Sequence, residues 1–214
     1  MGTLISIFIM MMCAYALARK DFKYKRIINF YLFFTMLFYG GMVPNYILVT
    51  QYLRLQNTVW ILIISGLVNV WYLFVLRTFI QDIPEAIMDS AMLDGAREFQ
   101  TFLFIVLPLS KPAIATIGLF VLLGRWNEWM TALLYITNPK LYPLQYLLQR
   151  ILQSLEEVLK SSGQTTADIS MSDEFSGEAV RMALAVVVAG PMLFIMPFFQ
   201  KYFVRGMTIG SVKG

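Results

Sequence analysis

The stretch "MDSAMLDGAREFQTFLFIVLP", residues 88–108, joins a charged beginning to an apolar end. The beginning is too polar to cross a bilayer, because each charged side chain at the centre of an inserted helix costs about 2.5–3.5 kcal/mol. The end is too apolar for an ordinary exposed loop. The segments on either side therefore have to show which environment this stretch occupies.

The composition of the whole chain is that of a membrane protein. Hydrophobic residues make up 58% and charged residues 14% of the 214 residues, and the mean hydropathy is +0.66. Soluble domains are nearer ~45–50% apolar and ~25% charged. A soluble core of this size cannot bury several runs of about 20 apolar residues, so the composition predicts an integral membrane protein.

The counts of cysteine and histidine exclude several kinds of site. The sequence contains one cysteine and no histidine, which excludes disulfide frameworks, Cys/His zinc sites and histidine-based triads. Cys13 lies in an apolar run and is predicted to be a small core residue. The sequence shows neither a nucleophile with a base nor a metal cluster, so it does not indicate an enzyme.

Long apolar runs predict an all-α fold, a polytopic transmembrane helix bundle of about five helices, in one domain over residues 1–214. The first run is short for a span, and no basic leader precedes it as in a signal peptide. Gly40, Gly41 and Pro44 predict a bend in the second run. The runs cover residues 3–18, 27–49, 59–76, 102–137 with breaks, and 183–204.

Basic residues predict the orientation. Residues 19–26, "RKDFKYKR", hold five positive charges in eight positions and are expected in the cytoplasm. Alternation then places 77–111 inside, 138–181 outside and the C-terminus, with its basic tail, in the cytoplasm. Met1 falls outside, with nothing polar before the first helix. The expected explanation is that the chain begins partway through what should be its second helix.

The external region, 138–181, has two expected parts. Residues 144–160 place apolar side chains three and four positions apart, which predicts an amphipathic helix on the outer face or on a partner. Residues 161–178, "SSGQTTADISMSDEFSGE", read as a flexible polar insertion. The apolar stripe of the helix comprises Leu144, Leu147, Leu148, Ile151, Leu152, Leu155, Val158 and Leu159.

A short cytoplasmic helix is predicted just before and within the opening stretch. Asp82 is the expected N-cap, Pro84 the first turn, and Gly95 the left-handed exit. One face of this helix is acidic and the other apolar. A negative strip is repelled by anionic lipid, so docking on a cytoplasmic protein with a groove is favoured over a membrane-surface helix or a solvated connector. The apolar face holds Ile83, Ile87, Met88, Ala91 and Met92, and the acidic face holds Asp82, Glu85 and Asp89.

The spacing here resembles the EAA signature of ABC importer permeases. That signature reads Glu-Ala-Ala, three residues, Gly, nine residues, Ile, any residue, Leu-Pro. Residues 89–91, "DSA", stand at its start, followed at the same spacings by Gly95, Ile105 and then Leu107 with Pro108. Asp89-Ser90 replaces Glu-Ala, which keeps the charge and a small residue.

Three further segments are similar to the carbohydrate branch of these permeases, the maltose and lipoprotein-associated oligosaccharide type. They are "IPEA" with "LDGA" and "LPLSKPA" around the signature, residues 124–145, "GRWNEWMTALLYITNPKLYPLQ", and the terminus 198–214, "FFQKYFVRGMTIGSVKG". The resemblance covers essentially the whole chain. Members of this branch normally have six spans, against about five predicted here.

The resemblance implies that residues 82–108 form the coupling loop, which sits in a cleft of an ATPase subunit. This chain has no phosphate-binding Gly-x-x-x-x-Gly-Lys-Ser/Thr loop, so no cofactor is expected on it, and ATP and magnesium belong to the partner. The coupling residues implied are Glu85, Asp89, Ser90, Ala91, Asp94, Gly95, Ala96, Ile105, Leu107 and Pro108.

The cluster "RWNEW", residues 125–129, is the expected lining of the solute path. Arg125 and Glu128 are three positions apart and are predicted to pair on one helix face. Trp126, Asn127 and Trp129 offer stacking and amide groups that suit a sugar. The alternative is an aromatic belt at the outer interface. The residues Asn69, Trp71 and Tyr72 are weaker candidates, for which core packing is favoured.

These observations predict one membrane subunit of an ATP-driven carbohydrate importer in a prokaryotic cytoplasmic membrane. The expected partners are an ABC ATPase dimer, a sister permease, an extracytoplasmic solute-binding protein, the lipid bilayer and an oligosaccharide; no nucleic acid is expected. Two alternatives remain open: a non-assembling remnant of such a permease, or a permease for another solute class.

Overall fold

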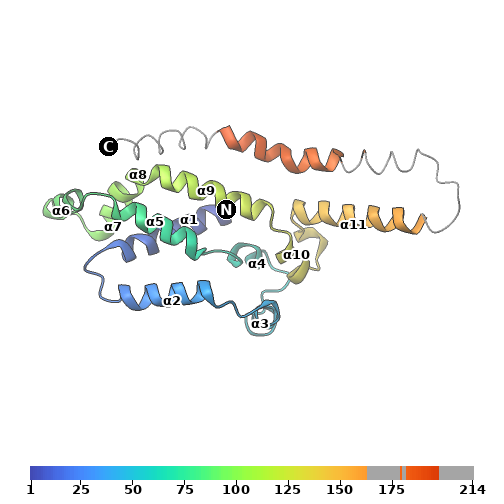
Figure 1. The fold of residues 1–214 in the computed structure, drawn as a ribbon, viewed down its shortest axis with the longest axis horizontal. Helices are drawn as coiled ribbons and strands as arrows, with labels where there is room; N and C mark the ends of the chain where they lie inside the picture. Colours follow the sequence, from blue (N-terminus) through green and yellow to red (C-terminus); the bar gives the residue numbers. More distant parts are fainter. Residues whose placement is uncertain (163–178, 180–181, 198–214) are drawn as a thin grey trace.

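The computed structural model describes residues 1–162, 179 and 182–197 (Figure 1). Within these residues the chain folds into helices and contains no strand, which confirms the all-α prediction. The expected polar insertion, apart from its first two residues, and the terminal segment 198–214 with its basic tail lie outside the described residues.

Three helices form the main core. α1 (Gly2–Ala18) packs most extensively against α5 (Val70–Gln81) and α9 (Lys111–Trp126), and Figure 1 shows the three side by side. The exposed fraction of Met10, Met11, Ala14 and Leu76 rounds to zero. These are apolar residues at helical spacing, so their burial against one another stabilises the bundle.

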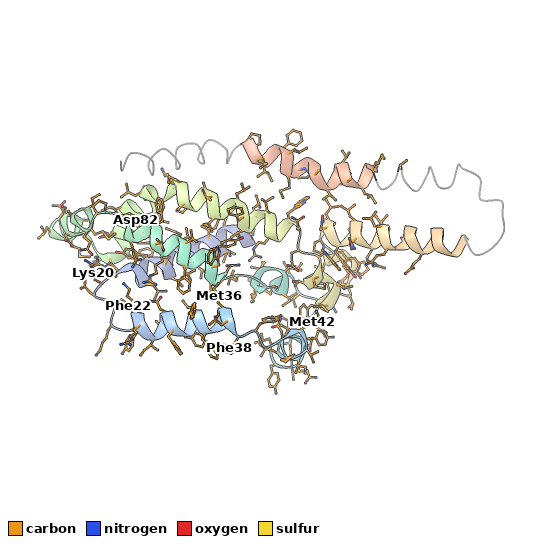
Figure 2. All side chains as sticks on the ribbon, in the orientation of Figure 1. Lys20, Phe22, Met36, Phe38, Met42 and Asp82 are labelled. Carbon is orange, nitrogen blue, oxygen red and sulfur yellow. The ribbon has the colours of Figure 1, made fainter. Side chains whose placement is uncertain are left out.

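The predicted bend in the second apolar run is confirmed. α2 (Lys25–Leu37) ends before α3 (Met42–Ile47) and the π-helix η1 (Leu48–Tyr52), and the two segments meet at 114°. Gly41 precedes α3 with φ of +93°, a backbone conformation that glycine adopts without a steric penalty. Figure 2 shows Phe38 and Met42 on the two sides of this bend.

The third apolar run, 59–76, forms two helices, which corrects its prediction as one. α4 (Val59–Ile64) ends at Ser65, and α5 begins at Val70. Gly66 adopts φ of +67° between them, which stops the helix, and Asn69 caps α5 by accepting from the Tyr72 amide at 3.1 Å.

By length and composition, none of the described helices crosses a membrane on its own. Two bent pairs meet those criteria together: residues 25–37 with 42–52, and residues 98–109 with 111–126, the second bent by 79°. The second pair is built from α7 (Glu98–Thr101), the π-helix η2 (Phe102–Val106), α8 (Leu107–Leu109) and α9.

A second hydrophobic cluster lies apart from the main core. It is built around α10 (Met130–Tyr135), the short helix η3 (Pro139–Leu141) and α11 (Leu144–Ser162) (Figure 1). α11 confirms the predicted helix after residue 144. Leu148 is buried, whereas Leu144, Leu147 and Ile151 of the predicted stripe are exposed. Leu144, Leu147 and Ile151 are therefore not covered by the residues that the structure describes.

The prediction for Cys13 was wrong, because its side chain is exposed. Met10, Met11 and Ala14 occupy the face of α1 that packs against α5 and α9. Cys13 falls outside that face.

Candidate functional sites in the 82–108 loop and beside Arg125

The predicted short helix exists as α6 (Glu85–Leu93), but Asp82 is not its N-cap. The Asp82 amide donates to the Thr78 carbonyl, so this residue ends α5. Pro84 occupies the N-cap position in an extended conformation and makes no side-chain cap. Proline disfavours a helical conformation in the residue before it, which separates the two helices at Ile83.

The exit from α6 is a Schellman motif. Gly95 adopts φ of +82°, its amide donates to the Met92 carbonyl, and the Ala96 amide donates to the Ala91 carbonyl at 2.9 Å. This pair of bonds satisfies the last carbonyls of the helix and requires a left-handed residue. The predicted left-handed exit at Gly95 is therefore confirmed. Among the described residues, a Cβ at Gly95 would meet nothing within 4 Å, so the constraint that they place on this position is the backbone angle.

α6 separates apolar from acidic side chains. Met88 and Ala91 are buried against the bundle, while Glu85, Asp89 and Ser90 are exposed. Ile87 of the predicted apolar face is 40% exposed, and Leu93 at the end of the helix is 89% exposed. The outer surface of α6 is therefore acidic and also exposes the apolar side chains of Ile87 and Leu93.

The remaining loop residues lie where the chain turns back into the bundle. Asp94 is exposed beside the turn, and Ala96 is half-buried. Ile105 and Leu107 are half-buried, and Pro108 is exposed.

The loop ends at a sharp change of direction. Ser110 terminates α8, and α9 then leaves at 79°. The Ser110 hydroxyl is buried and has no hydrogen-bond partner among the described residues. The bend therefore separates the loop from the long helix that runs toward Arg125.

The loop is tied to α1 and to the basic segment after it. Glu98 accepts from the Tyr15 hydroxyl at 2.6 Å and from Arg19 Nη2 at 3.0 Å. Lys20 Nζ lies 2.8 Å from the Glu85 carboxylate. Figure 2 shows Lys20 and Asp82 at the end of the molecule that α6 occupies. The basic and acidic segments therefore meet in space, about 65 to 83 positions apart in sequence.

A cavity of about 530 Å³ lies between the start of α1, the break between α4 and α5, and the end of α9. Its lining combines apolar and polar side chains, as sites for small molecules do. The polar lining residues are Thr3, Ser65, Asn69, Tyr72, Arg125, Glu128 and Thr131. Of the residues 125–129, Arg125 and Glu128 line this cavity.

Arg125 and Glu128 do not pair as predicted. Arg125 donates to the carbonyl oxygens of Leu62 and Ile63, both at 3.1 Å, and of Gly66 at 3.4 Å. The carbonyls of Leu62 and Ile63 lie at the end of α4, and that of Gly66 lies in the break after it, so a cation there is favoured by hydrogen bonding and by the helix dipole. No ion pair joins Arg125 to Glu128 in the part of the chain described.

Glu128 instead caps the next helix. Its carboxylate accepts from the Thr131 amide and hydroxyl, each at 3.0 Å. The Thr131 hydroxyl lies 3.1 Å from that of Ser65. A carboxylate at a helix N-terminus is favoured by the unpaired amides there. The network joins α10 to the break after α4 across the cavity wall.

The other three residues of the cluster point elsewhere. The Trp126 indole donates to the Val188 carbonyl at 3.2 Å, and the Asn127 amide donates to the Leu123 carbonyl at 3.1 Å. Trp129 packs against the second hydrophobic cluster. The path role assigned to these three residues stays a prediction.

Sequence reasoning missed Ser65, Thr131 and Thr3 as cavity residues. Short hydroxyl side chains inside apolar runs carry no distinctive spacing, and only the break after α4 brings them together. Asn69 and Tyr72 were the weaker candidates, yet both line the cavity. No group of three or more possible metal ligands occurs within the described ranges.

Comparison with known proteins identifies the family. Residues 3–209 match the model of the binding-protein-dependent transport system inner membrane component. The chain is 41% identical to the polygalacturonan/rhamnogalacturonan transport system permease protein YtcP of Bacillus subtilis, over 100% of this chain and 73% of YtcP. It is 38% identical to protein LplC of the same organism, over 100% of this chain and 70% of LplC.

A solved structure agrees with these matches. It is a crystal structure of a bacterial ABC transporter involved in the import of the acidic polysaccharide alginate, and one of its chains superposes with a TM-score of 0.79 at 26% identity. The match covers 94% of this chain and 70% of that chain. The chain therefore belongs to the family of binding-protein-dependent transport system inner membrane components, the permeases of ABC importers.

Proposed function

We propose that this chain is a membrane-spanning permease subunit of an ATP-driven importer of oligosaccharides. The observation that carries the proposal is the 82–108 loop. It has the EAA spacing, folds as a short helix with a Schellman turn at Gly95, and presents an exposed acidic surface with Leu93. A surface of this kind suits the groove of a partner protein.

The proposed assembly contains an ABC ATPase dimer, a sister permease and an extracytoplasmic binding protein. ATP and magnesium bind to the ATPase, and this chain converts movement of its coupling loop into movement of membrane helices. In the proposed topology, residues 82–108 and the C-terminus are cytoplasmic, and residues 138–181 are external. The five positive charges at 19–26 support the cytoplasmic side, because short basic loops stay inside.

The cavity beside Arg125 is the proposed part of the solute path in this subunit. Glu128 and Thr131 already bond to each other, while the Tyr72 hydroxyl and the Asn69 amide nitrogen make no hydrogen bond within the described chain. A ring, an amide and hydroxyls are groups that bind sugars by stacking and hydrogen bonding. Arg125 shapes this wall through its bonds to α4.

The substrate class we favour is an acidic oligosaccharide. The similar protein YtcP is named for polygalacturonan and rhamnogalacturonan, and the similar crystal structure concerns the acidic polysaccharide alginate. All three polymers contain uronate carboxylates. A labelled oligogalacturonide is therefore the first solute to test, with a neutral malto-oligosaccharide and an amino acid as comparisons.

The test begins with a detergent pull-down of the full chain from its native membrane, followed by mass spectrometry. Recovery of an ATPase and a second permease is expected, and a chain recovered alone would favour a non-assembling remnant. The recovered complex is then placed in vesicles with its binding protein, MgATP and each labelled solute. Oligogalacturonide uptake is expected; uptake of the amino acid alone would indicate another solute class.

A further inference from the structure

We infer that α1 transmits movement from the coupling loop to the solute cavity, and that the clamp formed by Tyr15, Arg19 and Glu98 attaches the helix to the loop. The inference rests on the proposed function and adds to it the element that carries the movement. α1, together with Arg19 directly after it, contacts the loop at one end and lines the cavity beside Arg125 at the other.

The clamp occupies the loop end of α1. Glu98 is the first residue of α7, and each of its two carboxylate oxygens has its own donor: Oε2 accepts from Tyr15 and Oε1 from Arg19. Tyr15 is 8% exposed, and the Arg19 side chain is 19% exposed. Charge-assisted bonds to partly buried donors are stronger than those in open water, so the carboxylate fixes α7 to α1.

Arg19 also contacts the other half of the loop. Its guanidinium approaches the sulfur atoms of Met88 at 4.0 Å and Met92 at 3.7 Å, on the buried side of α6. One side chain therefore touches α6 and α7, on both sides of the turn at Gly95. Displacement of either half of the loop acts on Arg19.

An aromatic contact reinforces the clamp one turn further into the bundle. Phe102, 2% exposed, follows α7 and packs on Tyr15 with ring centroids 5.5 Å apart, and on Phe8 at 6.2 Å. Aromatic pairs at these distances resist sliding past one another, because the core around them is close-packed. The loop is thus attached to α1 by an ion pair and by packing.

The other end of α1 forms the cavity wall. Gly2 and Thr3 line the cavity, and a Cβ at Gly2 would come within 2.9 Å of Arg125 Nη1. The Ser6 hydroxyl donates to the Leu67 carbonyl in the break between α4 and α5. A shift of α1 along or about its axis changes this end of the cavity directly.

The helix between the two ends is unbroken. α1 runs for 17 residues without an internal proline, a length of about 25 Å at 1.5 Å per residue. Regular α-helices with intact backbone bonds bend only gently. α9, by contrast, leaves the loop through the 79° bend at Ser110, and α5 meets α6 through the extended Pro84, which makes no side-chain cap.

The experiment uses the complete importer in proteoliposomes, with its binding protein, MgATP and the labelled oligogalacturonide. Tyr15→Phe combined with Glu98→Gln removes the charge of the ion pair and the hydrogen bond from the Tyr15 hydroxyl, and it keeps the ring of Tyr15 on Phe102. We expect ATP hydrolysis per complex to persist while oligosaccharide imported per ATP falls about tenfold, as loss of charge-assisted bonds in a coupling step predicts.

Two further variants test the assignment. Lys20→Gln breaks the neighbouring exposed ion pair to Glu85 and is expected to leave the import-to-ATP ratio unchanged. Arg19→Glu combined with Glu98→Arg reverses the ion pair. Either single change is expected to lower the import-to-ATP ratio, and the double variant is expected to restore part of that loss, because the swapped charges still attract.

The outcomes separate this inference from the proposed function. An unchanged ratio in the Tyr15→Phe, Glu98→Gln variant would overturn the inference, and so would a lower yield of complex whose remaining molecules keep the wild-type ratio. If the wild-type complex itself neither hydrolyses MgATP nor imports the sugar, the proposed function fails instead.

Discussion

Arg19 and Arg125 lie near opposite ends of α1 and are both partly buried, yet they bind different kinds of acceptor. Arg19 binds the Glu98 carboxylate, whereas Arg125 binds three backbone carbonyls at the end of α4 and in the break after it. Glu98 is 57% exposed, so water reaches the first contact. The second contact uses backbone atoms that a side-chain change at another position cannot remove.

This difference assigns the two arginines different roles. An ion pair with a half-exposed carboxylate contributes little to the free energy of unfolding, so its loss should change how the loop is held more than how stable the fold is. The last carbonyls of a helix have no partner within that helix, so a cation that binds them holds the break between α4 and α5 in shape. We therefore expect Arg19 to affect coupling and Arg125 to affect stability.

The largest effect, a loss of stability, is expected from Arg125→Gln. Replacing the guanidinium leaves carbonyls at the end of α4 unsatisfied, which costs about 2–4 kcal/mol when charged-group bonds are lost in a partly buried site. Arg19→Gln is the matched change and is expected to cost much less. The thermal unfolding midpoints of the two purified complexes check the difference; equal midpoints would remove the distinction between the arginines.

Gly95→Val is expected to have the next largest effect. Valine is β-branched and costs about 1–2 kcal/mol in the left-handed conformation that this position requires. The turn between α6 and α7 is displaced, so membrane insertion should persist while ATP hydrolysis is uncoupled from uptake. Gly95→Asn tolerates the same φ and serves as the control; normal uptake by the valine variant would contradict the docking role of the loop.

Glu128→Ala removes the cap of α10 and is expected to cost about 1 kcal/mol, the usual value for a lost N-terminal cap. Glu128→Gln keeps an acceptor for the Thr131 amide and should lose less. Unfolding midpoints of the two variants separate capping from a role of the charge. A larger loss with glutamine than with alanine would show that capping is not what Glu128 contributes.

The smallest effect is expected at Lys20. The neighbouring Glu85 carboxylate raises the pKa of Lys20, so the pair contributes fully below the ordinary lysine pKa and its contribution is lost as pH rises through the raised value. Because both side chains are exposed, Lys20→Gln should leave the unfolding midpoint at neutral pH unchanged. A clear loss at neutral pH, sensitive to salt, would show a stronger pair than the structure indicates.

Local signals in the sequence predicted local structure well. The helix around Glu85–Leu93, the left-handed Gly95, the bend at Gly41 and the helix after residue 144 each depend on residues close together in the chain. Glycine, proline and helical spacing act over a few positions, so they can be read without knowing the fold. The family signature relies on the same short-range spacing.

Contacts between distant segments could not be predicted in the same way. The sequence favoured a pair between Arg125 and Glu128 because they are three positions apart, but the carbonyls that Arg125 binds are about 60 positions earlier. The break at residues 65–69 lies in a run whose apolar composition suits a continuous helix. The partner of Tyr15 is likewise decided by the packing of α1 against the bundle.

The long separation between Tyr15 and Glu98 also has a consequence for how the protein is made. The two residues are 83 positions apart, and a ribosome adds about 5–20 residues per second, so Tyr15 and Arg19 precede their acceptor by about 4–17 s. During those seconds the polar groups at the end of the first helix lack their acceptor in this chain. Water or the insertion machinery has to satisfy them until residue 98 arrives.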